Sequence, residues 1–271
     1  MKEAIVSYFQ TQQALIDANL QLAKGTHDIE ALHDLRVAVK RLKALYQIVE
    51  ILSEGIFEYR AHFEDIRKLF KTVGSLRDIQ VQSQLFASFV TDLEESEIIG
   101  FYQYLQKRHD KASKKLDKAL YRFNPEVMNE SLKDVSFLLD QKSEERGKDL
   151  VVKYLKKRLK QITKLNRVKH DERKIHLMRT RLKQLMYAME LMKMIAPDQE
   201  LMQNGNNVKK AGTSLGLWHD HIVLADELQQ FIKNYAILKA PYRKLLKRVR
   251  AQEAFYLSKA RKRVQKVLDN R

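Results

Sequence analysis

The sequence predicts an all-α protein, and its composition and apolar spacing carry that prediction. The 271 residues include only 8 Gly and 3 Pro, so few breaks interrupt the chain. Leu, Lys, Glu, Gln and Ala are frequent, and these residues favour helices over strands. Apolar side chains make up 44% of the sequence and recur at helical spacing, which is enough for a packed core.

Helix start and stop signals divide the first half into six elements. The polar residues 26–28 begin the second helix, and Gly55 breaks it. Gly74 is expected to end another helix, because the Ser-x-x-acid pattern of residues 75–78 is typical of a helix start. The expected helices span residues 1–24, 28–53, 57–73, 75–91, 98–122 and 127–141.

The second half repeats this plan after a polar boundary at residues 141–147. Pro197 is expected to end one helix, and another is expected to open after Gly216. We expect residues 1–145 and 146–271 to form two helical bundles that together make one domain. The expected helices of the second bundle span residues 149–167, 171–195, 198–211, a segment after Gly216, and 241–268.

Residues 33–43 (HDLRVAVKRLK) are the most informative stretch, because a helix here has two different faces. Apolar residues share one face, and basic residues at i, i+3 and i+7 share the other. The same His, Arg and Lys spacing returns 143 residues later, and His27 corresponds to His170 at this offset. The candidate anion contacts in the two segments are His33, Arg36, Lys40, Arg41 and Lys43 in the first half, and His176, Arg179 and Lys183 in the second.

A second cluster of residues repeats at an offset of 142 residues. Gly74 and Asp78 in the first half correspond to Gly216 and Asp220 in the second. Because two separate clusters keep nearly the same spacing, we interpret the chain as an internal duplication. A basic pair precedes each glycine, and these pairs are further candidate contacts: Arg67 with Lys68, and Lys209 with Lys210.

Three further helices carry basic stripes, one of them in residues 151–170, which contain no acid. Like charges at i, i+4 repel each other by a few tenths of a kcal/mol, so a bound anion would offset this cost. A solvated face is the alternative for any single stripe. The other two stripes add candidate contacts: Lys107, Lys111, Lys114 and Lys118 in one helix, and Arg243, Lys247 and Arg250 in the last.

The formal net charge of +17 makes a polyanion the first partner to consider. The excess lies in residues 146–271, which carry 31 Lys and Arg against 11 Asp and Glu. Arg, Lys and His together suit phosphate oxygens, and a stripe of several helical turns suits an extended polymer better than one small phosphate. The sequence has no Gly-rich phosphate loop, so nucleotide hydrolysis has no support.

Other kinds of site find little support in the sequence. No two histidines stand at i, i+4, so we expect neither a metal site nor a cofactor. Asp78 and Asp220 are assigned to capping or salt bridging, and Trp218 and the methionines of residues 178–194 are assigned to the core. The chain lacks cysteine and lacks an apolar stretch long enough to span a membrane, so we expect a cytoplasmic protein with no membrane partner.

Residues 33–43 and 73–81 (VGSLRDIQV), with their weaker copies around His176 and Gly216, resemble the CHAD family, the conserved histidine α-helical domains. The resemblance implies two helical bundles related by pseudo-twofold symmetry. It also implies that basic helices line a central surface or pore that binds inorganic polyphosphate, in association with polyphosphate granules. The phosphate contacts implied by the motif are His33, Arg36, Lys40, His176, Arg179 and Lys183.

The leading hypothesis is therefore a non-catalytic protein that binds inorganic polyphosphate. Two alternatives stay open. The same stripes could bind RNA or DNA without sequence specificity, because net charge alone does not distinguish phosphate polymers. An enzyme of phosphate metabolism could instead use a histidine as acid or base.

Overall fold

The computed structural model describes residues 1–140, 142–168, 171–196, 200–235 and 239–269, and these residues form helices and no strand. The all-α prediction is confirmed. Pro197 and His170, the predicted helix stop and the predicted counterpart of His27, lie outside the described residues. The helices are α1 (Lys2–Ala23), α2 (Ile29–Leu52), α3 (Tyr59–His62), α4 (Glu64–Phe89), α5 (Glu95–Arg122), α6 (Glu126–Asp140), α7 (Glu144–Asn166), α8 (Glu172–Ile195), the 3-10 turn η1 (Glu200–Asn204), α9 (Gly205–Asn234) and α10 (Lys239–Asp269).

Gly74 does not end a helix and no new helix begins after Gly216, which corrects two predicted boundaries. α4 runs through Gly74, and α9 runs through Gly216 and covers the second half of the predicted helix at 198–211. Ser75 does not cap a new helix, because its hydroxyl donates to the carbonyl oxygen of Lys71, 3.1 Å away in the same helix. Buried apolar residues continue on both sides of each glycine, so packing outweighs the weak helix propensity of Gly.

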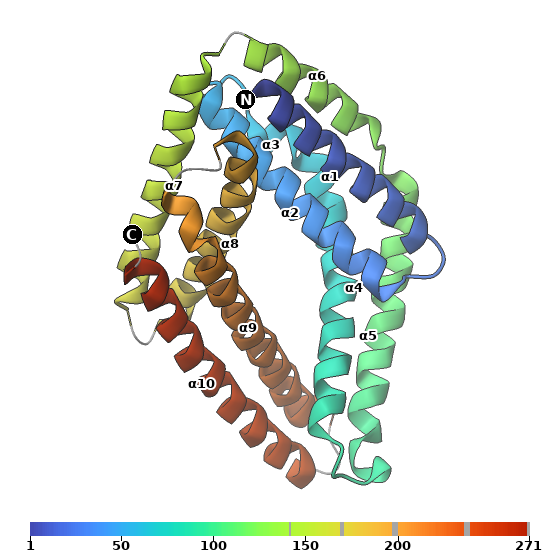
Figure 1. Ribbon diagram of the computed structural model, residues 1–271. Helices are drawn as coiled ribbons and strands as arrows, with labels where there is room; N and C mark the ends of the chain where they lie inside the picture. Colours follow the sequence, from blue (N-terminus) through green and yellow to red (C-terminus); the bar gives the residue numbers. More distant parts are fainter. Residues whose placement is uncertain (141, 169–170, 197–199, 236–238, 270–271) are drawn as a thin grey trace.

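The helices pack as neighbouring pairs that follow the same order in both halves (Figure 1). α1 pairs with α2 and α4 with α5, and α7 pairs with α8 and α9 with α10. At the centre α2 packs on α8, and α4 packs on α9. The internal duplication and the boundary between residues 145 and 146 stay predictions, although this pairing order is consistent with both.

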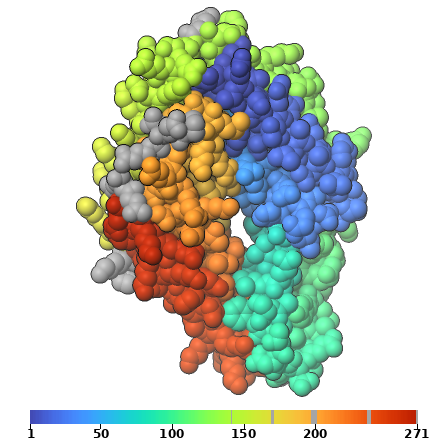
Figure 2. Space-filling view, in the orientation of Figure 1, coloured from blue at the N-terminus to red at the C-terminus, as the bar shows by residue number. Residues whose placement is uncertain are grey.

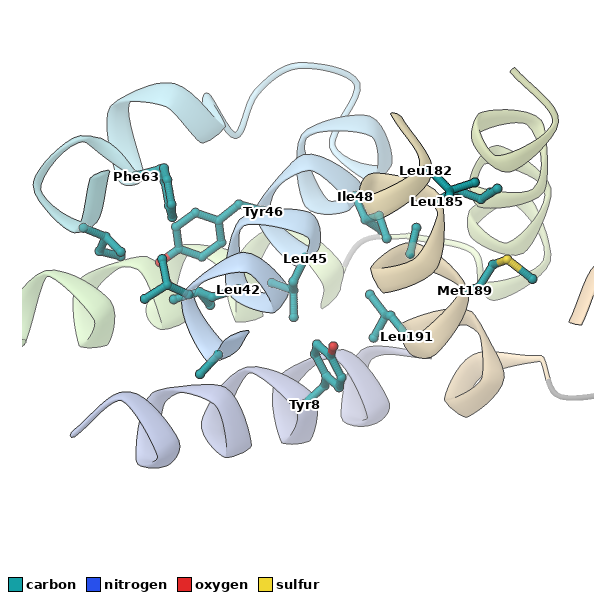
Figure 3. Close-up of a cluster of buried hydrophobic side chains, with 14 of the residues drawn as sticks. Tyr8, Leu42, Leu45, Tyr46, Ile48, Phe63, Leu182, Leu185, Met189 and Leu191 are labelled. Atoms are coloured by element: carbon teal, nitrogen blue, oxygen red, sulfur yellow. The ribbon is translucent and has the colours of Figure 1, made fainter. Parts of the chain in front are cut away.

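The larger hydrophobic core joins residues from both halves of the chain. Leu45 and Ile48 of α2 are buried in the same core as Leu185 and Leu191 of α8 (Figure 3). Burial of these apolar side chains fixes α2 against α8, and thereby fixes the distance between the two copies of the basic motif. Trp218 is buried here as predicted.

The methionines of residues 178–194 are not all in the core, and this corrects the prediction. Met178, Met189 and Met192 are buried, and Met186 packs partly against them. Met194 is 50% exposed, because it lies in the last turn of α8 beyond the apolar face.

A smaller core joins the far ends of α4, α5, α9 and α10. Phe86 of α4 and Phe101 of α5 lie with their ring centroids 4.6 Å apart, and Phe231 and Tyr242 complete the cluster. The two cores are separate, and along α4 the buried polar residues Gln80 and Gln82 lie between them. Figure 2 shows an opening in the surface between α4 and α9.

Candidate functional site

Two copies of the basic motif meet where α2 packs on α8. Arg36, Lys40, Arg179 and Lys183 form one group, which we term the central cluster. Burial and the charges of Lys183, Arg36 and Arg179 together lower the pKa of Lys40 to about 7. Burial and Arg179 lower the pKa of Lys183 to about 8. The structure therefore brings together four cations that the sequence separates by more than a hundred residues, and it partly removes them from water.

Arg36 is held in place by three neighbours from α4. Its Nη2 lies 3.5 Å from Oδ1 of Asp78, so the salt-bridging role expected for this aspartate is confirmed, although the residue lies within a helix and not at its start. The guanidinium lies 5.0 Å from the ring centroid of Phe70, within range of a cation–π interaction. It also lies against Gly74, where a Cβ atom would overlap it. The absence of a side chain at Gly74 thus leaves the space that the Arg36 guanidinium occupies.

The second half of the site is built differently. Burial raises the pKa of the Asp220 carboxyl, against the opposing charges of Arg179 and Lys183. Burial and the cations around it lower the pKa of His219 to about 3, so this imidazole is neutral at physiological pH. His176 lies 4.8 Å from the Trp218 ring, measured between centroids, and 3.3 Å from the Glu172 carboxylate.

The charge balance of this region favours a multivalent anion. Four half-buried cations face two carboxylates, Asp78 and Asp220, and the second of these is itself half-buried. The repulsion among the cations lowers both lysine pKa values, and an anion that contacts several of them would relieve it. Arginine offers a planar fork for two oxygens, and lysine offers a mobile ammonium, which together suit phosphate groups.

Several other predicted contacts bind acids of the chain. Arg41 donates from Nε to Glu190 Oε2 at 2.9 Å, on the side of α2 that faces Tyr8 and Tyr187. Lys68 pairs with Glu64 and Asp65 on its own helix. Arg250 pairs with Asp226 and Glu253, each at 2.8 Å, and Lys43 lies over the ring of Phe63.

The remaining predicted contacts are exposed on their helices and are not part of the central cluster. His33 is among them, so it lies further into solvent than its counterpart His176. The exposed residues are His33 on α2, Arg67 on α4, Lys107, Lys111, Lys114 and Lys118 on α5, Lys209 and Lys210 on α9, and Arg243 and Lys247 on α10.

α4 and α5 enclose a groove with a volume of about 1130 Å³. The predicted residues Lys68, Lys111 and Lys118 line it. Four lining cations were not among the predicted contacts: Lys71, Arg108, Lys115 and Arg122. The signal for α5 was present, because positions 108, 111, 115, 118 and 122 share one face at alternating spacings of three and four. The predicted stripe at 107–118 included Lys111 and Lys118, which lie on this face. Its other two members, Lys107 and Lys114, lie beside the face.

Metal and membrane sites find no support in the described part of the chain. No group of three His, Asp or Glu side chains there could hold a metal ion. No helix among the described residues is long and apolar enough to cross a membrane.

Comparison with known proteins identifies the class of protein that this fold and site define. A family model described as the CHAD domain matches residues 7–229, so the chain belongs to the CHAD domain family and the predicted resemblance is confirmed. No curated protein matches the chain.

Two solved structures share the fold. The crystal structure of the CHAD domain from the plant Ricinus communis superposes with a TM-score of 0.75 at 19% identity, over 98% of this chain and 91% of that chain. PptA from Streptomyces chartreusis superposes with a TM-score of 0.69 at 14% identity, over 99% of both chains. At these identities the comparison supports the fold alone.

Proposed function

We propose that the protein binds inorganic polyphosphate at the central cluster, without catalysing a reaction on it. The observation that carries the proposal is the convergence of Arg36, Lys40, Arg179 and Lys183 from α2 and α8. Burial, together with repulsion between these half-buried cations, lowers the pKa of Lys40 to about 7, and an extended polyanion would relieve the repulsion. Membership of the CHAD domain family supports the same ligand, because the sequence motifs that define the resemblance supply all four residues.

Two other roles for the same residues compete with this proposal. Nucleic acid would bind the exposed lysines equally well, but it would gain less from half-buried cations set back between helices, because a duplex is wide and stiff. A phosphohydrolase would need a general acid or base beside the phosphate. His219 is unsuited to that role because its pKa is about 3, and we assign Lys40 and Lys183, with pKa values of about 7 and 8, to charge contacts with phosphate and not to proton transfer. We place the protein in the cytoplasm, in contact with polyphosphate granules, as part of this proposal.

A competition titration tests the proposed ligand. Labelled long-chain polyphosphate is titrated at two salt concentrations and competed with duplex DNA of equal phosphate content. We expect polyphosphate to bind more tightly than DNA, with an affinity that falls steeply with salt because each neutralised phosphate releases a counterion. Stronger binding to DNA would contradict the proposal, and release of phosphate or shortening of the chain would contradict its non-catalytic part.

A matched pair of variants tests the proposed site. Lys40→Gln with Lys183→Gln removes two charges from the central cluster, and Lys262→Gln with Lys266→Gln removes two exposed charges from α10. We expect the central pair to weaken binding by about tenfold or more and the α10 pair by less than about threefold. Equal losses would show that total charge, and not the central cluster, determines binding.

A further inference from the structure

The two long helix pairs of the protein differ in how they pack. α9 and α10 contact each other along their whole length, from the rings of Phe231 and Tyr242 at 5.0 Å to the bond between Ser214 and Arg263 at 2.7 Å. α4 and α5 are joined by aromatic contacts near their connection, where Phe86 meets Phe101. Beyond that point they enclose the α4–α5 groove, which is open to solvent.

Ile79 and His221, which each follow one of the two aspartates, show what fills the space between α9 and α10 that is open between α4 and α5. Ile79 follows Asp78 and lines the α4–α5 groove. His221 follows Asp220, and the ring of Tyr256 from α10 covers it, with the ring centroids 4.9 Å apart. The chain thus supplies its own aromatic side chain to one helix pair and leaves the other pair open.

The α4–α5 groove combines an apolar floor with a cationic rim. Leu69, Ile79, Leu105 and Ala112 line it and are largely buried, so they form its floor. Basic residues line both sides: Lys68 and Lys71 from α4, and Arg108, Lys111, Lys115, Lys118 and Arg122 from α5. Three acids also line it, and each is engaged by a cation: Asp65 pairs with Lys68, Asp78 with Arg36, and Glu227 with Arg108.

We propose that the α4–α5 groove binds an acidic amphipathic helix of a partner protein. Residues 65–82 of α4 rise about 26 Å along the groove, which matches a guest helix of about 17 residues. The apolar stripe of such a helix would cover the floor, and its flanking carboxylates would face the cations on both sides, as in helix-in-groove recognition. This site is separate from the central cluster and goes beyond polyphosphate binding.

The groove suits this partner better than it suits a phosphate polymer. A polyphosphate chain has no apolar surface, so it gains nothing from the buried leucine and isoleucine side chains of the floor. It would also meet the carboxylates of Asp65 and Glu227 inside the groove. An amphipathic helix can place apolar or neutral residues at those positions.

A designed peptide pair tests the proposal on the full chain. The probe is a labelled synthetic peptide of about 18 residues, with leucines at i, i+3, i+4 and i+7 and glutamates beside them. The control peptide has the same composition in scrambled order, so the charge is equal and the apolar stripe is lost. We expect the patterned peptide to bind about tenfold more tightly than the scrambled one at equal ionic strength.

Two variants locate the binding site. Ser75→Trp places a bulky side chain at an exposed position that lines the groove, and Ser88→Trp makes the same change at an exposed position of α4 outside it. Lys111→Glu with Lys115→Glu reverses two rim charges, and Lys262→Glu with Lys266→Glu reverses two exposed charges of α10. We expect the two groove variants to weaken peptide binding by about tenfold and the two controls by less than about twofold.

Three outcomes would overturn the proposal. Equal binding of the two peptides would show that charge alone attracts them. An unchanged affinity in Ser75→Trp would place the peptide elsewhere. Loss of polyphosphate binding in Ser75→Trp, together with equal binding of the two peptides, would instead assign the groove to the phosphate polymer.

Discussion

Arg36 and Arg179 occupy matching positions in α2 and α8, yet their surroundings differ. Arg36 pairs with Asp78 at 3.5 Å and lies over the Phe70 ring. No carboxylate of the described residues lies within ion-pair distance of Arg179, and Gly212 stands 142 residues after Phe70, where an aromatic ring would be needed. Arg36 is therefore held by specific contacts, whereas Arg179 is half-buried and the carboxylates of Asp220 and Asp78 oppose its charge without forming an ion pair with it.

The residues next to the two aspartates differ in the same way. The first half has Leu76-Arg77-Asp78, and the second has Trp218-His219-Asp220. His219 is neutral because its pKa is about 3, and its ring lies 5.0 Å from that of His176. Both halves therefore supply cations to the site, while the residues that position those cations differ between the halves.

The largest expected effect separates the two arginines. Arg179→Gln should weaken polyphosphate binding by about thirtyfold, because it removes a charged hydrogen-bond donor with no competing ion pair. Arg36→Gln should weaken binding by about fivefold, because Arg36 must first give up part of its interaction with Asp78. Fluorescence titrations at fixed salt measure both values, with circular dichroism to confirm folding. A larger loss of polyphosphate affinity in Arg36→Gln than in Arg179→Gln would contradict this prediction.

The second prediction concerns the pH dependence of binding. The lysine pKa values of about 7 for Lys40 and about 8 for Lys183 lie below their usual range, and a bound anion favours the protonated form of each. Affinity should therefore be highest below pH 7 and fall by about tenfold towards pH 9, at constant ionic strength. Removing Lys183 takes away the largest neighbouring charge that lowers the pKa of Lys40.

Lys183→Gln consequently sharpens this test. The remaining pH dependence of binding should shift to higher pH, because Lys40 then stays protonated over a wider range. The α10 pair Lys262→Gln with Lys266→Gln serves as the control and should keep the wild-type profile. An affinity that does not change between pH 6.5 and pH 9 would show that neither lysine titrates in the site.

Local patterns predicted the fold class and most helix bounds, whereas contacts between distant residues decided the errors. The residues of the central cluster were predicted because the repeat placed equal charges on equal faces. The boundary at Gly74 was wrong because the helix continues beneath a side chain from α2, which no local pattern reveals. The pairing of Arg41 with Glu190 likewise joins residues 149 positions apart.

The predicted stripe on α5 shows a different kind of error. Helical spacing assigns residues to faces, but the neighbouring helices decide which face lines a groove. Lys111 and Lys118 line the α4–α5 groove, and Lys107 and Lys114 are exposed beside it. Arg108 and Lys115 could have been included from the same sequence, had the direction of α4 been known.

The third prediction compares the two glycines. In Gly74→Ala the new Cβ would overlap the Arg36 guanidinium, and the end of this flexible side chain would have to move. We expect binding to weaken by about threefold. The helix propensity of Ala should offset part of the stability that the fold loses through this strain. Gly216 has open space around its Cβ position, so Gly216→Ala should leave binding unchanged and stabilise the fold by up to about 1 kcal/mol. Equal effects on binding would mean that Gly74 does not position Arg36.

The smallest expected effect is on thermal stability, and it differs between Lys40 in the first half and Lys183 in the second. The pKa of Lys40 in the folded state is below its usual value, so the charged form of Lys40 lowers the stability of the folded protein. This loss of stability is complete below pH 7 and declines as the pH rises towards 10.5. Lys40→Met should remove that cost and raise the melting temperature by about 3 °C at pH 6, and by less at pH 9. Lys183→Met should give a smaller rise, because its pKa is lowered less. Thermal unfolding followed by circular dichroism measures both values, and a fall in melting temperature for both variants would show that the two lysines stabilise the ligand-free fold.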